Sequence, residues 1–165
     1  MLDLDFKKYD RQIRHFGKEV QIKLSTVTIN IQSNDPNSLI SGEILKNLVL
    51  LGVNNLHYDD NTYKSYKKLV PNEIYQINSN VQFCKLEEYD YNFIIYKCSN
   101  NETIEKNVVY ICTDHYTFKK CKTPCNTDKI DKDIIKDCLL GGIITQEFIK
   151  KLQGNFFLDF YTLVI

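Results

Sequence analysis

Apolar residues near the start of the chain recur at spacings of three and four, between residues 10 and 24. They are Ile13, Phe16, Val20 and Leu24. This spacing places them on one face of a helix. Gly17 lowers the local helix propensity without interrupting the apolar pattern. We therefore predict one helix over residues 10–24.

The next segments alternate between strand-like and helix-like patterns. Residues 27–31 read as a strand, and the polar stretch 32–38 reads as a loop. Residues 39–51 carry apolar positions at helical spacing and end at a glycine, and residues 53–58 read as a second strand. The pattern predicts a helix followed by a β-α-β unit.

The rest of the chain predicts further α/β elements, with weaker signals in the centre. Residues 61–79 are polar and Tyr-rich, and read as a short helix with loops. The remaining expectations are strands at 92–98 and 108–113 joined by a crossover at 100–107, a strand at 116–120, a loop at 122–128, a helix at 131–152 and a strand at 156–163. We predict one α/β domain over residues 1–165, with a mostly parallel sheet.

Composition removes several classes of partner from consideration. The 165 residues carry 21 basic and 21 acidic side chains, so no global field attracts nucleic acid or an anionic membrane. No apolar run approaches the roughly 20 residues that span a bilayer. The acidic N-terminus, with no long apolar stretch, does not resemble a secretory signal. We expect no nucleic-acid or membrane partner.

The six cysteines are expected to be reduced thiols. Cys84, Cys98 and Cys112 lie in or beside apolar runs, where a thiol behaves as a small hydrophobic group. Cys121 and Cys125 could supply half of a zinc site, with His115 nearby. A structural zinc site normally takes four ligands and no second close pair is present, so no metal site is predicted.

Three segments together resemble the adenylating domains of the ThiF/MoeB and ubiquitin-activating enzyme superfamily. Residues 9–14 read YDRQIR and continue to Leu24 like the opening helix of these domains. Residues 43–53 read EILKNLVLLGV, like the helix after the nucleotide loop. Residues 141–150 read GGIITQEFIK, like a late helix of the family, and 155–157 read NFF, like the strand after it. The centre, about 60–130, matches only in pattern.

The resemblance implies a fold and a function. The fold is a Rossmann-like α/β adenylation domain of reduced size. The opening and ending strings are most similar to the smaller, non-catalytic subunits of SUMO-activating enzymes, and next to the corresponding subunits for the cullin-directed, Rub-type modifier. Such a subunit pairs with a larger catalytic subunit, and that partner binds ATP and Mg²⁺ and, in the complex, the ubiquitin-like modifier. By this analogy the chain works in the nucleus and cytoplasm.

The loop that would hold ATP lacks the glycines that phosphate binding requires. Glycines let the backbone approach the phosphates at a helix N-terminus. Counted back from residue 43, the expected glycine positions fall on Pro36, Ser38 or Leu39, and Ser41. Side chains there would fill the phosphate space, and Asp35 would add a like charge. We therefore expect this chain to bind no cofactor in its own degenerate loop.

Other catalytic elements of the family are also missing from the sequence. It has no metal-coordinating Asp in a recognisable context, no N-x-x-R pair and no separate cysteine domain. Cys138 is expected to face the core and not to form a thioester. Asp59 or Asp60 stands where the family has its ribose-binding acid, but without a phosphate loop we interpret it as a strand-end residue.

One retained feature predicts an active role. In the family, the first Arg of the R-Q-I-R string reaches across the dimer to the ATP of the partner, and here that residue is Arg11. A fixed guanidinium on phosphate oxygens offsets charge during transfer. The alternative is a solvated helix charge. Tyr9 and Gln12 could fix the pose of Arg11, and Arg14 is a supporting surface residue.

The late helix contains two adjacent glycines, which cost roughly 1 kcal/mol each relative to Ala. Gly141 and Gly142 therefore indicate close approach by a backbone, from within this domain or from a partner subunit. Together with Gln146 they are candidate interface residues. Three hypotheses remain open: a pseudo-enzyme subunit acting through Arg11, an enzyme that binds nucleotide despite its degenerate loop, and a purely structural scaffold.

Overall fold

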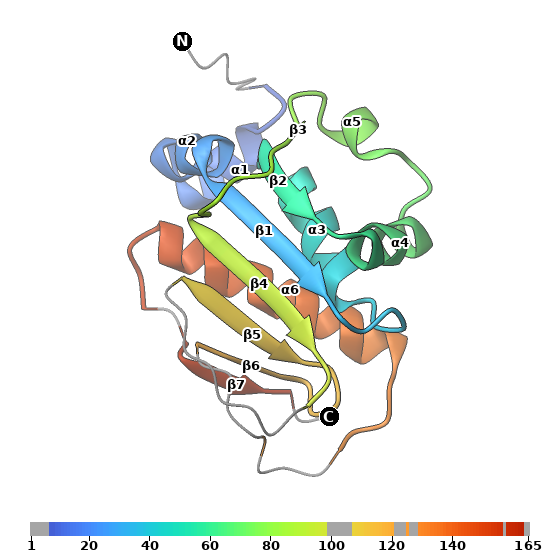
Figure 1. Ribbon diagram of the computed structural model, residues 1–165. Helices are drawn as coiled ribbons and strands as arrows, with labels where there is room; N and C mark the ends of the chain where they lie inside the picture. Colours follow the sequence, from blue (N-terminus) through green and yellow to red (C-terminus); the bar gives the residue numbers. More distant parts are fainter. Residues whose placement is uncertain (1–6, 99–106, 121–124, 126–128, 157, 164–165) are drawn as a thin grey trace.

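Seven strands form one sheet, as expected for a mostly parallel α/β domain. The computed structural model describes residues 7–98, 107–120, 125, 129–156 and 158–163. The strands are β1 (Thr28–Ser33), β2 (Asn55–Tyr58), β3 (Gln82–Phe83), β4 (Tyr91–Tyr96), β5 (Val108–Cys112), β6 (Thr117–Lys119) and β7 (Phe160–Thr162). Their order across the sheet is β3-β2-β1-β4-β5-β6-β7 (Figure 1). The first five strands pair in parallel, whereas β6 and β7 join in antiparallel fashion.

The helices confirm most of the predicted segments and correct one of them. They are α1 (Asp10–Phe16), α2 (Lys18–Thr26), α3 (Ile40–Leu50), α4 (Asp60–Leu69), α5 (Ile74–Ile77) and α6 (Ile134–Leu152). The single helix predicted over residues 10–24 is wrong, because Gly17 adopts a φ of 91° and separates α1 from α2. That conformation is open to glycine at little cost, so the residue ends one helix and turns the chain into the next.

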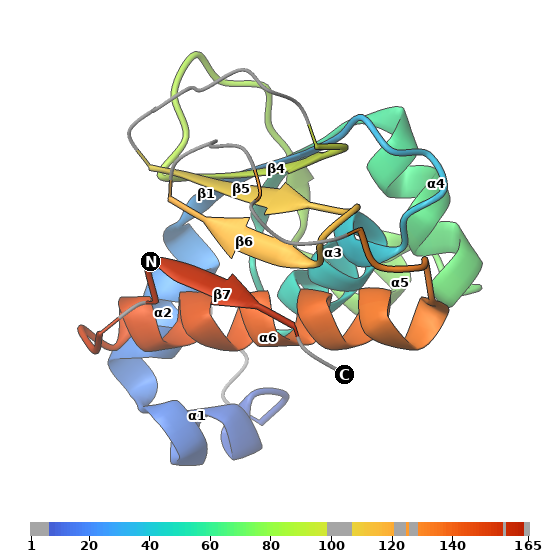
Figure 2. The same cartoon turned by 90° about the horizontal axis from the view of Figure 1, so that it is seen from below.

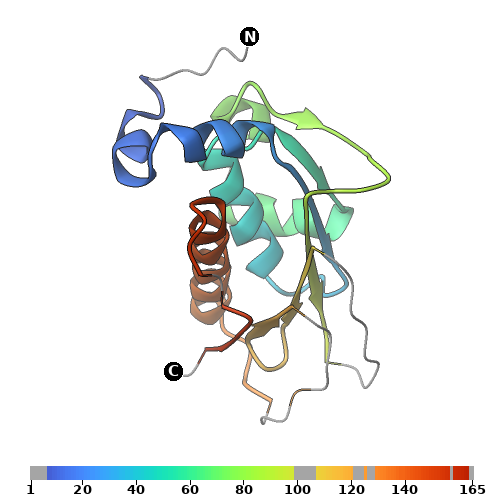
Figure 3. The ribbon, with the colours of Figure 1, turned by 90° about the vertical axis from the view of Figure 1, so that its left-hand side faces the viewer.

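Strand alternation sends one set of side chains into the main core and the other set to the opposite face of the sheet. Ile29, Ile31, Phe93 and Ile111 join the main core with residues of α2, α3 and α6. These three helices lie on one side of the sheet (Figures 2 and 3). On the opposite face no described helix crosses β1, β4 and β5 (Figure 1). A smaller apolar cluster lies there instead, built on Tyr96 and residues of β5.

Close helix packing depends on two glycines of α3 and α6. A Cβ atom at Gly42 would lie 2.5 Å from backbone atoms of α4, and one at Gly141 would lie 2.7 Å from the Cβ of Glu43. Real side chains do not tolerate such distances, so only glycine lets these helices approach. The consequence is that α3 is held tightly between α4 and α6.

The last strand is shorter than the sequence predicts. The predicted strand 156–163 is observed only over Phe160–Thr162, and Phe156 of the NFF string is 78% exposed in the connection after α6. Residue 157 and the predicted crossover at 100–107, apart from Asn107, lie outside the described residues. The two-residue strand β3 had no clear sequence signal. Among the described residues, no helix has the length and apolar character needed to cross a membrane.

Candidate functional site

The loop between β1 and α3 occupies the position at which open α/β sheets bind ligands. From β1 the chain adds β2 and β3 on one side and β4 and β5 on the other, so the strand order reverses between β1 and β4. Open α/β sheets bind ligands at such a switch point, at the carboxyl ends of the strands. Here that position is taken by the side chain of Asp35, which is 1% exposed. The loop therefore carries its own anion at the position where a glycine-rich loop of this kind of fold binds phosphate.

Asp35 is held by groups from three other parts of the chain. Its carboxylate accepts a hydrogen bond from the Thr113 hydroxyl at 2.8 Å and is paired with Lys132, and Lys97 Nζ lies 3.9 Å away. Burial alone would raise the pKa of Asp35, but the bonds from Lys132, Thr113 and the Asn37 amide outweigh it and hold that pKa below its ordinary value. The carboxylate is therefore charged at neutral pH and locked into the loop.

The amino end of α3 is also satisfied by groups of the chain itself. The Leu39 amide donates to the Asp137 carboxylate at 2.5 Å, and the Ile40 amide donates to the Ser38 hydroxyl at 3.2 Å. Exposed amides at a helix N-terminus are the usual anion site of this fold. Asp137 comes from α6 and is buried, which raises its pKa despite the hydrogen bonds that it accepts.

Asp35 and Asp137 together fill the amino end of α3, which we call the sealed end. The residues predicted to replace glycines lie around it. Ser38 and Ser41 are buried, and Pro36 is exposed at the tip of the loop. Ser38 is fixed further because its carbonyl accepts a hydrogen bond from the Ser65 hydroxyl at 3.0 Å. Asp137 was missed by sequence reasoning, although a charged residue on the core-facing stripe of α6 was an available signal.

Asp59 has the structural role that the sequence favoured. One carboxylate oxygen accepts the Thr62 amide at 2.8 Å and caps α4, and the other accepts the Ser33 amide at 2.8 Å. Both oxygens are thus engaged by backbone amides, one in the first turn of α4 and one at the end of β1. Asp60 is the exposed first residue of α4.

The opening helix is fixed to the carboxyl end of α3. Tyr9 is 4% exposed, and a Cβ at Gly52 would lie 2.6 Å from its ring. The Gln12 side-chain amide donates to the Leu50 carbonyl at 3.0 Å, and the Gln21 side-chain amide donates to the Leu51 carbonyl at 2.8 Å. These contacts give α1 a defined position at the end of the domain remote from the sealed loop.

The two arginines of the opening helix differ in their surroundings. Arg14 pairs with Asp10 one turn earlier, at 2.6 Å, and both side chains are well exposed. Arg11 is exposed on α1, and among the described residues it forms no ion pair or hydrogen bond. Its guanidinium projects from a helix that Tyr9 and Gln12 hold in place.

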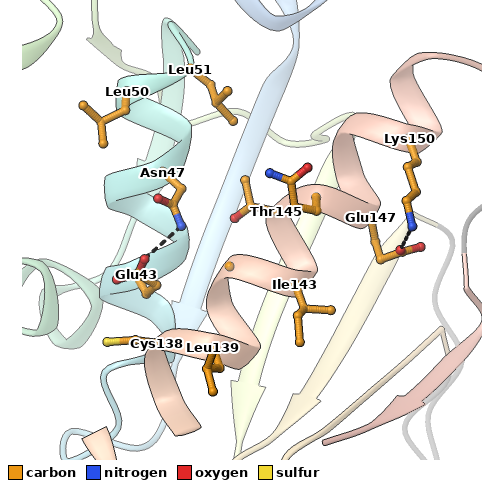
Figure 4. Close-up of a pocket in the computed structure, with 12 residues that line it drawn as sticks. Glu43, Asn47, Leu50, Leu51, Cys138, Leu139, Ile143, Thr145, Glu147 and Lys150 are labelled. Atoms are coloured by element: carbon orange, nitrogen blue, oxygen red, sulfur yellow. Dashed lines mark hydrogen bonds and ion pairs between the residues drawn. The ribbon is translucent and has the colours of Figure 1, made fainter. Parts of the chain in front are cut away.

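A groove of about 630 Å³ lies between the outer faces of α3 and α6 (Figure 4). Its apolar wall includes Leu50, which is 48% exposed, and Leu139, which is 44% exposed. Two buried carboxylates lie in the wall with polar partners: Glu43 accepts from Asn47 at 3.1 Å, and Glu147 pairs with Lys150. The groove thus combines exposed apolar surface with fixed charge.

The two glycines of α6 differ in environment. Gly141 faces α3 and permits α3 and α6 to pack closely. This confirms that the glycine serves packing within the domain. Gly142 lines the groove, and a Cβ there would meet nothing within 4 Å. Gln146 is exposed on the same wall. The structure therefore brings Gly142 and Gln146 together on an open surface and removes Gly141 from it.

Cys138 does not face the core, in contrast to its prediction. It is half-buried on the groove wall, where burial and the neighbouring Glu43 carboxylate raise the pKa of its thiol. A raised pKa keeps the thiol protonated and is unfavourable for a nucleophile. Cys121 lies outside the described residues, so the predicted Cys121–Cys125 pair is not described.

Comparison with known proteins identifies the fold. No protein-family model matches the sequence, and no curated protein matches it. Crystal structures of Escherichia coli MccB do match: one has a TM-score of 0.59 and 12% identity, and covers 96% of this chain and 66% of that chain. A structure of MccB with ATP matches with a TM-score of 0.55 and 10% identity, over 89% of this chain and 64% of that one. PaaA matches with a TM-score of 0.61 and 10% identity, over 99% of this chain and 81% of that chain.

The chain therefore has the fold of MccB and PaaA, the mostly parallel α/β fold that the ThiF/MoeB resemblance implied. This chain spans about two thirds of the length of the MccB chains that it matches. At these low identities the likeness concerns the fold and not a particular activity.

Proposed function

We propose that this chain is the non-catalytic subunit of a heterodimeric, ATP-dependent activating enzyme for a ubiquitin-like modifier, with SUMO favoured. It completes and stabilises the adenylation site of a larger catalytic subunit. That partner binds ATP and Mg²⁺ and makes most of the contacts with the modifier. This chain binds no cofactor of its own. The pair works in the nucleus and cytoplasm, and the Rub-type modifier is the next candidate.

The observation that carries the non-catalytic role is the sealed edge of the sheet. Asp35 fills the switch point with a buried, paired carboxylate, and Asp137 accepts the Leu39 amide at the start of α3. A nucleotide phosphate placed there would meet two carboxylates and no free cradle of amides. MccB has the same fold and has been crystallised with ATP, so it is this loop, and not the fold, that argues against nucleotide binding here.

The opening helix supports a contribution to the site of a partner. Arg11 is exposed and projects from a helix that is fixed to the domain by Tyr9 and Gln12. A guanidinium with a rigid base loses less freedom when it binds phosphate oxygens than one on a mobile segment. This is the arrangement that an arginine acting in trans requires.

The groove between α3 and α6 supports a partner surface. Leu50 and Leu139 are exposed apolar side chains on it, and Gln12 contacts the Leu50 carbonyl from the adjoining helix α1. Apolar surface with a polar rim is typical of protein interfaces. The groove therefore lies beside the helix that carries Arg11, so one partner could cover both.

Co-expression with the large activating-enzyme subunits of each modifier pathway tests the proposal. We expect one of them to co-purify with this chain, and the pair to form modifier adenylate. The isolated chain should show no saturable ATP binding in calorimetry. Saturable binding by the chain alone would instead identify an enzyme that uses its degenerate loop.

The role of Arg11 is tested in the purified pair. Arg11→Ala should lower adenylate formation on the order of 10³-fold, in the range of other arginines that act in trans. Arg11→Lys should recover little, because lysine lacks the planar guanidinium. Lys64→Ala removes one exposed positive charge from α4 and is the matched control, with an unchanged rate expected. An intact pair that is indifferent to Arg11→Ala would leave only a scaffold.

A further inference from the structure

Four metal-ligating side chains meet on the sheet face opposite the main helices. They are Cys98, Cys112, His115 and Cys125, and their ligand atoms all lie within 4.8 Å of one another. Cys112 Sγ lies 3.2 Å from His115 Nδ1. Cys112 and His115 are buried, and Cys98 and Cys125 are half-buried. Three thiols and an imidazole thus share one small volume.

The fold brings these residues together from three places. Cys112 ends β5, and the tight turn that follows folds His115 back over it, with Tyr116 at a φ of 47°. Cys98 follows the neighbouring strand β4, whose Tyr96 pairs with Cys112 across the sheet. Cys125 comes from the segment after β6, with its Sγ 3.6 Å from the Thr117 hydroxyl. The cluster therefore joins β4, the β5–β6 turn and a later segment.

We propose that Cys98, Cys112, His115 and Cys125 bind one structural Zn²⁺ ion. In a tetrahedral zinc site, Zn–S bonds of about 2.3 Å and Zn–N bonds of about 2.05 Å place ligand atoms roughly 3.6 to 3.8 Å apart. The present separations, up to 4.8 Å, are within about 1 Å of that geometry. Three cysteines and one histidine form a closed set, so the site leaves no open position for a substrate.

The surroundings fit a closed zinc site. Cys98 and Cys125 pack against an apolar cluster built on Tyr96, Val108 and Tyr110, which limits the access of water. The Asp114 carboxylate accepts the Cys98 amide at 3.2 Å and so orients the loop that carries one ligand. Outer-shell bonds of this kind position metal ligands.

The ion would tie Cys125 to the helix-free face of the sheet. It would join Cys125 to Cys98 and Cys112 on the face of β4 and β5 that carries the small apolar cluster. A structural metal commonly replaces missing core in a small unit. The inference concerns the stability of this chain and does not depend on the proposed function.

Metal analysis of the full chain tests this site. Elemental analysis should find about one zinc per chain, and the purified protein should take up Co²⁺ with the intense visible bands of a tetrahedral thiolate site. Cys98→Ser and Cys125→Ser should each lose the metal and lower the Tm. Cys84→Ser and Cys138→Ser change equally half-buried thiols outside the cluster, and they should keep both metal and Tm.

The same measurements can overturn the proposal. It fails if the wild-type chain, purified or refolded with Zn²⁺, binds none, or if Cys98→Ser and Cys125→Ser retain the ion. It also fails if thiol counting finds Cys98, Cys112 or Cys125 in a disulfide. If a serine variant does not fold, the Co²⁺ spectrum of the wild-type chain still decides, because its charge-transfer intensity reports the number of bound thiolates.

Discussion

The two ends of α3 have different surroundings. At its amino end, Asp137 accepts the first amide and Asp35 fills the adjoining loop, so charge is buried and paired inside the chain. At its carboxyl end and along its outer face, Leu50 is half exposed beside a groove and beside the opening helix. In this domain the sheet edge at which open α/β folds bind ligands is filled by carboxylates of the chain itself, while the outer face of α3 is left open.

This contrast explains which residue types occur in each region. The sealed end uses serine, aspartate and lysine, which satisfy one another at short range. The open face uses leucine, glycine and glutamine, which leave space and apolar area for a second molecule. The largest expected effects therefore come from filling the groove, and smaller ones come from loosening the seal.

A large side chain that fills the groove should weaken the binding of a partner to this face. Gly142→Arg would place a long charged side chain where a Cβ meets nothing within 4 Å. If a partner covers this wall, its affinity should fall about 100-fold, or about 2.7 kcal/mol. Titration calorimetry or a pull-down series measures the loss of affinity. Gly142→Ala, which adds only a methyl group at the same position, is the control. A partner that binds Gly142→Arg normally would place the interface elsewhere.

Loosening the seal should cost stability without opening a nucleotide site. Asp35→Asn removes the charge that holds Lys132 and Lys97 and weakens the bond from Thr113. We expect the free energy of unfolding to fall by about 1–3 kcal/mol. Urea denaturation at neutral pH measures the change. Asp131→Asn, the same exchange at an exposed aspartate, is the control and should give a smaller change. An unchanged midpoint for Asp35→Asn would mean that the seal contributes little.

The two glycines of α6 offer a sharper comparison within one helix. Gly141→Ala forces a methyl group to within 2.7 Å of Glu43 and should destabilise the chain by about 1–2 kcal/mol, because overpacking outweighs the gain in helix propensity. Gly142→Ala has open space and should stabilise by about 0.5–1 kcal/mol. Thermal unfolding of both variants shows whether each substitution raises or lowers the stability of the chain. Equal shifts would contradict the assignment of one glycine to packing and the other to the groove.

The smallest effects concern pH, and the two sealing carboxylates should respond with opposite signs. The pKa of Asp35 is lowered on folding, so its contribution to stability is present above the ordinary value of 3.8 and is lost as pH falls through the lower folded value. The pKa of Asp137 is raised, so its contribution is present below 3.8 and is lost as pH rises through the higher folded value.

Unfolding measured from pH 7 to pH 3 in Asp35→Asn and Asp137→Asn separates the two carboxylates. The deficit of Asp35→Asn relative to wild type should shrink toward low pH, whereas Asp137→Asn should lose any advantage over wild type there. Parallel profiles for both variants would show that neither carboxylate titrates differently in the folded chain.

Local patterns predicted much of this fold because the strands and the longer helices carry strong periodicity. The β-α-β unit and α6 were predicted within a few residues. Gly17 was misjudged because propensity alone does not reveal that its backbone takes a left-handed conformation. The two-residue strand β3 depends on pairing with β2 and not on its own pattern.

The sites were predicted less completely because their residues are distant in the sequence. The missing glycines of the loop were readable, but the partners of Asp35 lie near residues 97, 113 and 132, and only the folded sheet brings them together. Likewise, closeness in the sequence pairs Cys125 with Cys121, and that pair alone predicted no metal site. The described cluster instead combines Cys125 with Cys98, Cys112 and His115.

A buried aspartate in place of a bound anion also changes how this domain responds to its environment. A protein that binds a ligand only when folded gains stability from that ligand, in proportion to the logarithm of its concentration. If the proposed function holds, the anion is covalently part of the chain, and no such linkage to a free nucleotide is expected at this edge of the sheet. The stability of the isolated domain should then stay the same as the concentration of ATP changes, which sets it apart from a domain that folds around its nucleotide.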